Sequence, residues 1–198
     1  MNWLAHFALS PPVATVRLGN WLPDLFAPSV VAGVPNPGIQ LGGRLHGVID
    51  RVTDRHPAVL SARERLPREL RRAAGIVLDV YWDHFLSREF ESRMGRPLVG
   101  FVEEVLADLE QVIDLAPPET REVLARMRDE AWLLSYQTPE GIELTLERIT
   151  RRLSPAARRY LLPARAREHL VQDQRRLQGD FDALWRDLNE SIQSPPPD

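Results

Sequence analysis

The chain has 198 residues, of which 43% are hydrophobic and 27% are charged, and its formal net charge is −3. A chain of this length and composition suits one globular domain and differs from disordered or fibrous proteins. It contains no cysteine, which excludes disulfides, thiolate metal sites and a cysteine nucleophile, so any metal would be bound by histidines and carboxylates.

The first forty residues predict short helical pieces between turns. Residues 1–9 carry no basic cluster, and no apolar run approaches the roughly 20 residues that a membrane span needs. We therefore expect no signal peptide, no membrane segment and a cytoplasmic location. Residues 10–40 contain six prolines and three glycines, which interrupt helices.

From residue 44 onward the apolar residues recur at helical spacing, and no stretch alternates like a β-strand. His56–Pro57 and Pro139 each predict the start of a helix. Further helices are expected over residues 44–54, 66–91 with an interruption at Gly75, 101–113, 123–134 and 170–188. The pattern predicts an all-α, single-domain helical bundle over residues 1–193, followed by a flexible proline-rich tail over residues 194–198.

A histidine and two aspartates lie at helical spacing in the segment that begins at residue 44. His46 and Asp50 are four residues apart and share one helix face, with Asp54 one turn further. A histidine nitrogen and a carboxylate oxygen on adjacent turns can bind one divalent cation. A solvated face on which Asp54 caps the next helix is also open at this point.

A second polar group, Asp79, Asp83 and His84, lies within a run of large apolar residues. Charged side chains in such a run are expected to be at least half buried, and buried carboxylates need partners or a metal. The alternative is that these aspartates pair with arginines such as Arg44 or Arg71.

The remaining polar candidates predict little by themselves. His6, Asn20 and Asp24 near the start of the chain would not alone indicate a site. His56 precedes a proline and is expected to fix a turn, and His169 is expected on the solvated surface of an arginine-rich helix.

All 25 basic residues are arginine, and they are clustered. Residues 63–72 contain five arginines against two glutamates, and residues 101–114 contain five acids and no base. The first cluster consists of Arg63, Arg65, Arg68, Arg71 and Arg72. It is a candidate docking surface for an acidic partner, and a plain solvated helix face is the alternative. The net negative charge and the absence of aromatic–basic alternation argue against nucleic acid as the partner.

Taken together, these segments resemble the acyl carrier protein phosphodiesterase family, most closely over residues 1–90. The specific parts are the opening Met1-Asn2-Trp3-Leu4-Ala5-His6 and the run Leu78-Asp79-Val80-Tyr81-Trp82-Asp83-His84-Phe85-Leu86. Supporting parts are Gly19-Asn20, Asp24, Val31-Ala32-Gly33, His46 with Ile49-Asp50, Thr53-Asp54, His56-Pro57 and Gly75-Ile76.

The resemblance implies an all-helical core distantly like the HD-type phosphohydrolases. It also implies a divalent metal, Mn²⁺ first with Mg²⁺ or Fe²⁺ possible, and hydrolysis of the phosphodiester that joins 4′-phosphopantetheine to a serine of acyl carrier protein. On this basis the metal ligands are expected from Asp24, His46, Asp50, Asp83 and His84. We expect Asp79 to orient a ligand histidine, and His6 and Asn20 to contact the phosphate or to protonate the leaving oxygen.

The chain departs from the family pattern beside His46. The family commonly has two arginines between this histidine and the following Ile-Asp, whereas this chain has Gly47 and Val48, and Ala8 stands where a second histidine is usual. The missing arginine would remove a phosphate contact. Two alternatives therefore remain, a related phosphohydrolase that acts on a nucleotide or another small phosphodiester, and an inactive helical binding protein. The oligomeric state is not indicated.

Overall fold

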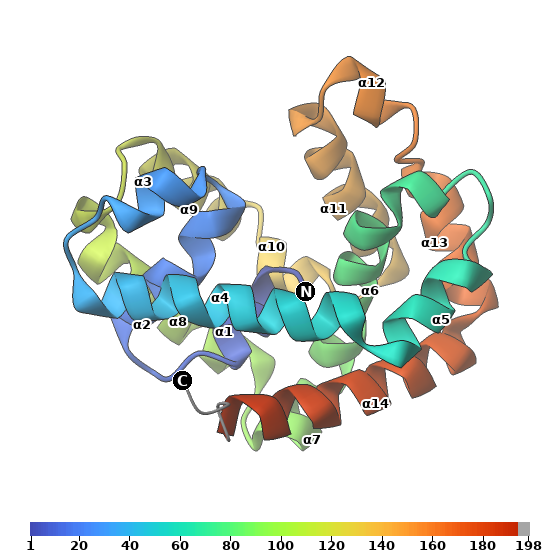
Figure 1. Cartoon of the computed structure of the whole chain (residues 1–198), viewed down its shortest axis with the longest axis horizontal. Coiled ribbons are helices and arrows are strands. Elements are labelled where there is room, and N and C mark those ends of the chain that lie inside the picture. The colour runs from blue at the N-terminus through green and yellow to red at the C-terminus, as the bar shows by residue number, and fades with distance from the viewer. Residues whose placement is uncertain (194–198) are drawn as a thin grey trace. The chain divides into compact units, whose positions relative to one another are not determined.

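The computed structural model of the chain describes residues 1–193 (Figure 1). Every regular element in this part of the chain is a helix and no strand occurs there, which confirms the all-α fold class. The expected tail over residues 194–198 lies outside the described residues. Among the helices of the described part, none combines the length and the apolar character needed to cross a membrane.

The helices are short and follow one another closely. The α-helices are α1 (Trp3–Ala8), α2 (Ala14–Trp21), α3 (Pro28–Ala32), α4 (Pro37–Arg55), α5 (Pro57–Arg65), α6 (Ala74–Arg88), α7 (Phe90–Met94), α8 (Leu98–Val112), α9 (Glu119–Asp129), α10 (Trp132–Ser135), α11 (Pro139–Arg152), α12 (Pro155–Arg158), α13 (Pro163–Gln172) and α14 (Gln174–Gln193). The 3₁₀ helices are η1 (Leu22–Asp24), η2 (Arg71–Ala73) and η3 (Ile113–Leu115).

Prolines open several of these helices, because the first helical position needs no backbone N–H. The starts predicted at Pro57 and Pro139 are confirmed. His56 caps α5 by accepting a hydrogen bond at Nδ1 from the backbone N–H of Ala58 at 3.2 Å, so its expected role in a turn is confirmed as well.

Helix α4 starts at Pro37, earlier than the predicted segment at residue 44. The side-chain oxygen of Asn36 accepts hydrogen bonds from the backbone N–H groups of Gly38 and Ile39 at 2.9 and 3.1 Å. Asn36 therefore caps the helix, and Pro37 takes its first position. The glycines that follow obscure the helical pattern in the sequence.

Three predicted helices were drawn too long. The segment predicted over 123–134 is divided between α9 and α10, around Ala131 with its positive φ of 49°. Leu66 has an extended backbone with ψ 141°, as residues before a proline prefer, so α6 begins at Ala74 and then runs through Gly75. The segment predicted over 170–188 is divided at Asp173, where φ is −107° and ψ is 15°. Helix α13 ends and α14 begins around this residue without disturbing the apolar spacing.

The described residues pack as two compact units. Unit A contains Trp3–Asp50 and Glu89–Leu134, and unit B contains Met1–Asn2, Arg51–Arg88 and the residues from Ser135 onward. Each unit combines separate stretches of the chain. The expected extent of one domain over residues 1–193 stays a prediction.

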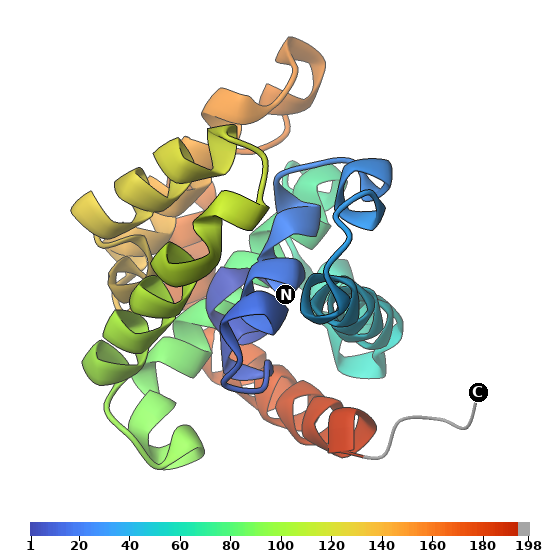
Figure 2. The same cartoon turned by 90° about the vertical axis from the view of Figure 1, so that its left-hand side faces the viewer.

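In unit A, α2 packs against α1 and α8, and α9 lies along α8 (Figures 1 and 2). The buried Arg17 of α2 forms ion pairs with Glu104 at 2.7 Å and with Asp108 of α8. The acidic segment over residues 101–114 is thus partly neutralised inside the unit. These ion pairs fix α2, which carries part of the candidate site.

In unit B, α6 packs against α5, α11 and α14 (Figure 1). The rings of Trp82 and Phe85 stack on Phe181 of α14, with centroids 6.3 and 5.9 Å away. Leu177, Phe181, Leu184 and Leu188 are fully buried, so the apolar stripe of the last helix packs inward.

Candidate metal centre

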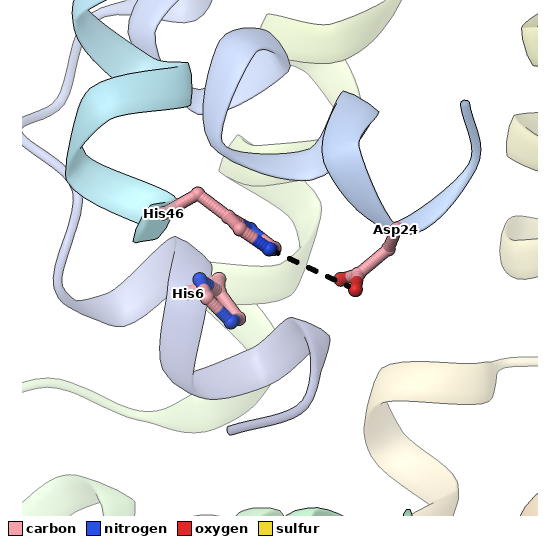
Figure 3. A group of neighbouring side chains, drawn as sticks. All are labelled: His6, Asp24 and His46. Atoms are coloured by element: carbon pink, nitrogen blue, oxygen red, sulfur yellow. Dashed lines mark ion pairs between the residues drawn. The ribbon is translucent and has the colours of Figure 1, made fainter. Parts of the chain in front are cut away.

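Two histidines and an aspartate meet in unit A at the distances that a bound cation needs (Figure 3). One ligand atom each from His6, Asp24 and His46 lies within 4.8 Å of the others. They come from α1, η1 and α4 respectively. The two imidazole rings stack with centroids 4.2 Å apart and planes tilted by 15°, so their nitrogens face the same space.

Glycines allow the backbones that carry these residues to approach closely. A Cβ on Gly42 of α4 would lie 2.2 Å from the carbonyl oxygen of Val16 and 2.6 Å from the amide nitrogen of Asn20. A Cβ on Gly19 would lie 2.1 Å from the carbonyl oxygen of Ile39. Only glycine permits such contacts. The close packing of α2 on α4 therefore depends on both residues.

Asn20 fixes the orientation of both histidines. Its backbone carbonyl accepts a hydrogen bond from Nδ1 of His46 at 2.8 Å, and its side-chain oxygen accepts one from Nδ1 of His6 at 2.9 Å. Since both acceptors are oxygens without a proton, each Nδ1 is the donor. In the neutral rings the lone pair is then on Nε2, the atom that ligates metals when the other nitrogen is held in this way.

A small buried network holds Asn20 in turn. Its side-chain nitrogen donates to the carbonyl of His6 and to Oγ of Ser10, both at 2.8 Å. Ser10 donates to the same carbonyl at 2.9 Å. All three residues are buried, so the network fixes the amide in one orientation.

Asp50 supplies a second carboxylate to the cluster. Its two oxygens lie 3.0 Å from Nε2 of His46 and 3.3 Å from Nε2 of His6. Burial opposes ionisation of Asp50, but the adjacent imidazoles of His46 and His6 outweigh it and hold the pKa of Asp50 well below its usual range. For His46, burial acts to lower the pKa, yet the bond to Asp50 and the nearby aspartates raise it above its usual value.

Asp24 lies at the open side of the group. Its carboxylate is 4.0 Å from Nε2 of His46, and 32% of its side chain is exposed. Loss of solvent around its carboxylate raises the pKa of Asp24, although the charges of His6 and His46 act to lower it.

The donor set fits a divalent cation. Nε2 of His6 is buried and makes no hydrogen bond, although a carboxylate oxygen lies at ion-pair distance. A buried imidazole nitrogen without a hydrogen bond is costly unless it binds something. Imidazole nitrogens combined with carboxylate oxygens suit borderline and hard divalent ions.

The structure groups five of the predicted site residues in unit A: His6, Asn20, Asp24, His46 and Asp50. Asp79, Asp83 and His84 lie on α6 of unit B. The carboxylate of Asp79 accepts a hydrogen bond from the N-terminal amine at 3.0 Å. His84 is buried and its Nδ1 donates to the carbonyl of Tyr136 at 2.7 Å, which leaves the lone pair of the neutral ring on Nε2. Asp83 is completely buried.

The five arginines of residues 63–72 differ in their surroundings. Arg65 pairs with Asp173 and Asp180, and Arg71 donates to backbone carbonyls, so both hold unit B together. Arg63, Arg68 and Arg72 are exposed. Arg72 lies over the ring of Tyr160 at 4.6 Å.

Two residues that support the site were missed in the sequence. Ser10 and Gly42 were not singled out, although a glycine inside a helix signals a close backbone approach.

His169, which lies outside the site, was expected at the surface. Only 6% of it is exposed, and its ring stacks on that of Tyr81 with centroids 6.1 Å apart. That prediction was wrong because the apolar face of α13 packs on α11 and carries the histidine inward.

The comparisons with a family model and with curated relatives agree on one family. The family model described as acyl carrier protein phosphodiesterase matches residues 1–188. The acyl carrier protein phosphodiesterase of Serratia proteamaculans is 35% identical over 137 residues, which cover 69% of this chain and 70% of the relative. The Photorhabdus laumondii protein of the same name is 30% identical over 186 residues, covering 93% and 89%. No solved structure matches the chain, so the expected distant likeness to HD-type phosphohydrolases stays a prediction.

Proposed function

The chain belongs to the acyl carrier protein phosphodiesterase family, and from this premise we propose that it removes the 4′-phosphopantetheine arm from holo-acyl carrier protein. Water would cleave the phosphodiester between the arm and a serine, giving the apo-carrier and 4′-phosphopantetheine. The observation that supports this reaction best is the group of His6, Asp24 and His46 within 4.8 Å, because phosphodiester hydrolysis commonly uses a bound cation.

The proposal includes a divalent ion, Mn²⁺ first, with Mg²⁺ or Fe²⁺ as alternatives. Its ligands in unit A would be Nε2 of His6, a carboxylate oxygen of Asp24 and Nε2 of His46. Such an ion lowers the pKa of a bound water and neutralises phosphate charge. His6, expected from the sequence to contact the phosphate, is better explained as a ligand.

The other residues of the site would position these ligands. Asn20 holds Nδ1 of both histidines, which leaves each Nε2 available. Asp50 lies 3.0 Å from Nε2 of His46 and helps to raise the pKa of this histidine. Because a metal binds the unprotonated Nε2, affinity for the ion should rise with pH. Asp50 remains a candidate for a further ligand. The expected roles of Asp83 and His84 as ligands and of Asp79 in positioning stay predictions.

The reaction can be tested by incubating the purified protein with holo-acyl carrier protein and Mn²⁺ and measuring the intact mass of the carrier. We expect loss of the phosphopantetheine mass. Holo-carrier that stays intact while Mn²⁺ is bound would favour another phosphodiester as substrate. Intact carrier without bound metal would favour a binding protein on the same fold.

Two substitutions connect this reaction to the proposed ligands. His46→Ala and Asp24→Ala should each lower the bound Mn²⁺ and abolish most hydrolysis. Asp129→Ala is the matched control, because Asp129 is an exposed aspartate on α9, outside the proposed centre, and this variant should behave like the wild type. Normal metal content in His46→Ala would contradict the assignment. The cytoplasmic location and the absence of nucleic-acid binding stay predictions.

A further inference from the structure

A cavity of about 470 Å³ opens beside His46 within unit A. Volumes of this order are typical of small-molecule sites. It is lined by residues of η1, α3 and α4: Pro23, Pro28, Val31, Ala32, Gln40, Gly43, Arg44, His46 and Gly47. One wall of the cavity is therefore a residue of the candidate metal centre, and Pro23 is the chain neighbour of Asp24.

The cavity has an aliphatic wall and two polar side chains, the latter on α4. Pro23, Pro28, Val31 and Ala32 provide aliphatic surface, whereas Gln40 and Arg44 provide an amide and a guanidinium. Both polar residues are exposed.

Glycine keeps the α4 side of the cavity open. A Cβ on Gly47 would meet no atom within 4 Å, and one on Gly43 would lie at ordinary contact distance, 3.4 Å from a methyl group of Val31 and 3.8 Å from the carbonyl oxygen of Gly19. The space beside Gly47 is therefore available to a ligand and would be filled by a larger side chain.

We propose that this cavity is the subsite for the pantetheine arm, and this inference rests on the proposed function. With the scissile phosphate at His6, Asp24 and His46, the atoms bonded to it must lie next to the centre, and the cavity adjoins His46. The arm begins with a methylene, followed by a carbon that bears two methyl groups, and continues through a hydroxyl and two amides. The aliphatic wall suits the methyl groups, and Gln40 and Arg44 suit the hydroxyl and amide oxygens. Gly47 then decides how wide an arm can enter.

The direct test is calorimetric titration of the Mn²⁺-loaded protein with pantetheine, which lacks the phosphate. The wild type should bind it. Gly47→Leu should weaken this binding and raise KM for holo-acyl carrier protein by at least about tenfold, or roughly 1.4 kcal/mol. Because leucine favours helix over glycine, the variant should fold and melt no lower than the wild type.

Gly179→Leu is the matched control. Gly179 also lies in a helix, and a Cβ there likewise meets no atom within 4 Å, but it belongs to α14 of unit B. This variant should keep the wild-type KM and pantetheine affinity. If Gly47→Leu proves unstable, Ala32→Phe tests the opposite wall with the same expectation.

The outcomes separate this inference from the proposed function. Wild-type affinity for pantetheine in both Gly47→Leu and Ala32→Phe would overturn the inference even if holo-carrier is hydrolysed. No pantetheine binding by the wild type would overturn it too. Pantetheine binding that is lost in Gly47→Leu, in a protein that leaves holo-carrier intact, would keep the subsite and reject the proposed reaction.

Discussion

Asn20 contacts both histidines of the candidate metal centre, His6 through its side chain and His46 through its backbone carbonyl. Asn20→Ala removes only the first contact. It also leaves Oγ of Ser10 without the amide donor and the carbonyl of His6 with Ser10 as its one remaining side-chain donor. We expect Mn²⁺ binding to weaken about 10- to 100-fold, as for other residues that orient a ligand. The protein should also lose about 1–3 kcal/mol of stability.

Calorimetry of metal binding and denaturant unfolding would measure the two effects. Asn189→Ala serves as control, since Asn189 also donates to a backbone carbonyl but lies on α14. Unchanged metal affinity in Asn20→Ala would show that the side chain does not position His6.

His169 gives a prediction about pH. Burial lowers its pKa, against the opposing charge of Asp173, so the folded protein holds this proton less readily than the unfolded chain. The stabilising contribution is present above pH of about 6.5, the unfolded value, and is lost as pH falls from there through the lower folded value. The pKa of buried His84 is also lowered, so its contribution to stability is likewise lost as pH falls. The pKa of His46 is raised, so its contribution is instead lost as pH rises.

His169→Gln should therefore reduce the loss of stability between pH 7.5 and pH 5.5. Urea unfolding of the metal-free protein at both pH values would measure the change, with wild type as reference. An equal loss in both proteins would mean that His169 remains neutral, or ionises without cost, in folded and unfolded chains alike.

At the scale of elements, the contact of α2 with α4 determines whether the ligands meet. In Gly42→Ala the new Cβ would lie 2.2 Å from a backbone oxygen, so the two helices must separate. We expect a loss of about 1–3 kcal/mol, as for other overpacked sites, together with weaker Mn²⁺ binding because Asn20 moves relative to His46.

Gly179→Ala provides the control for that substitution, because its Cβ meets nothing within 4 Å. It should gain up to about 1 kcal/mol from helix propensity. Thermal unfolding of both variants, with and without Mn²⁺, tests the contrast. Equal melting temperatures for the two would argue against a close contact at Gly42.

At the scale of the whole molecule, the clustered charges have different roles. In unit A the acidic segment is paired internally, for example through Arg17 with Glu104. In unit B, Arg63, Arg68 and Arg72 are exposed. These three are the part of the expected docking surface that remains available to an acidic carrier protein.

Arg68→Glu combined with Arg72→Glu should raise KM for holo-acyl carrier protein more than it lowers kcat, and should weaken the dependence of KM on salt. The control is Arg175→Glu combined with Arg186→Glu, which changes the net charge equally at exposed positions of α14. Steady-state kinetics at several salt concentrations measure both. An identical rise in KM for the two pairs would indicate a general charge effect rather than docking.

Features that depend on near neighbours in the chain could be predicted from the residues alone. Helical spacing and the absence of strand alternation predicted the all-α class, and Pro57 and Pro139 marked their helices. The four-residue spacing placed His46 and Asp50 on one face, where the structure pairs them at 3.0 Å. These features follow from the local geometry of a helix, in which residues four apart are neighbours.

Which distant residues share a site depends on how the helices pack, and this could not be predicted from the sequence. His6 and Asp24 reach His46 because Gly19 and Gly42 let backbones touch, a contact that helical periodicity does not report. The same holds for the burial of His169 and for the pairing of Arg65 with Asp173 and Asp180. Both features depend on which face of a helix packs against another helix. That packing involves contacts between residues far apart in the chain.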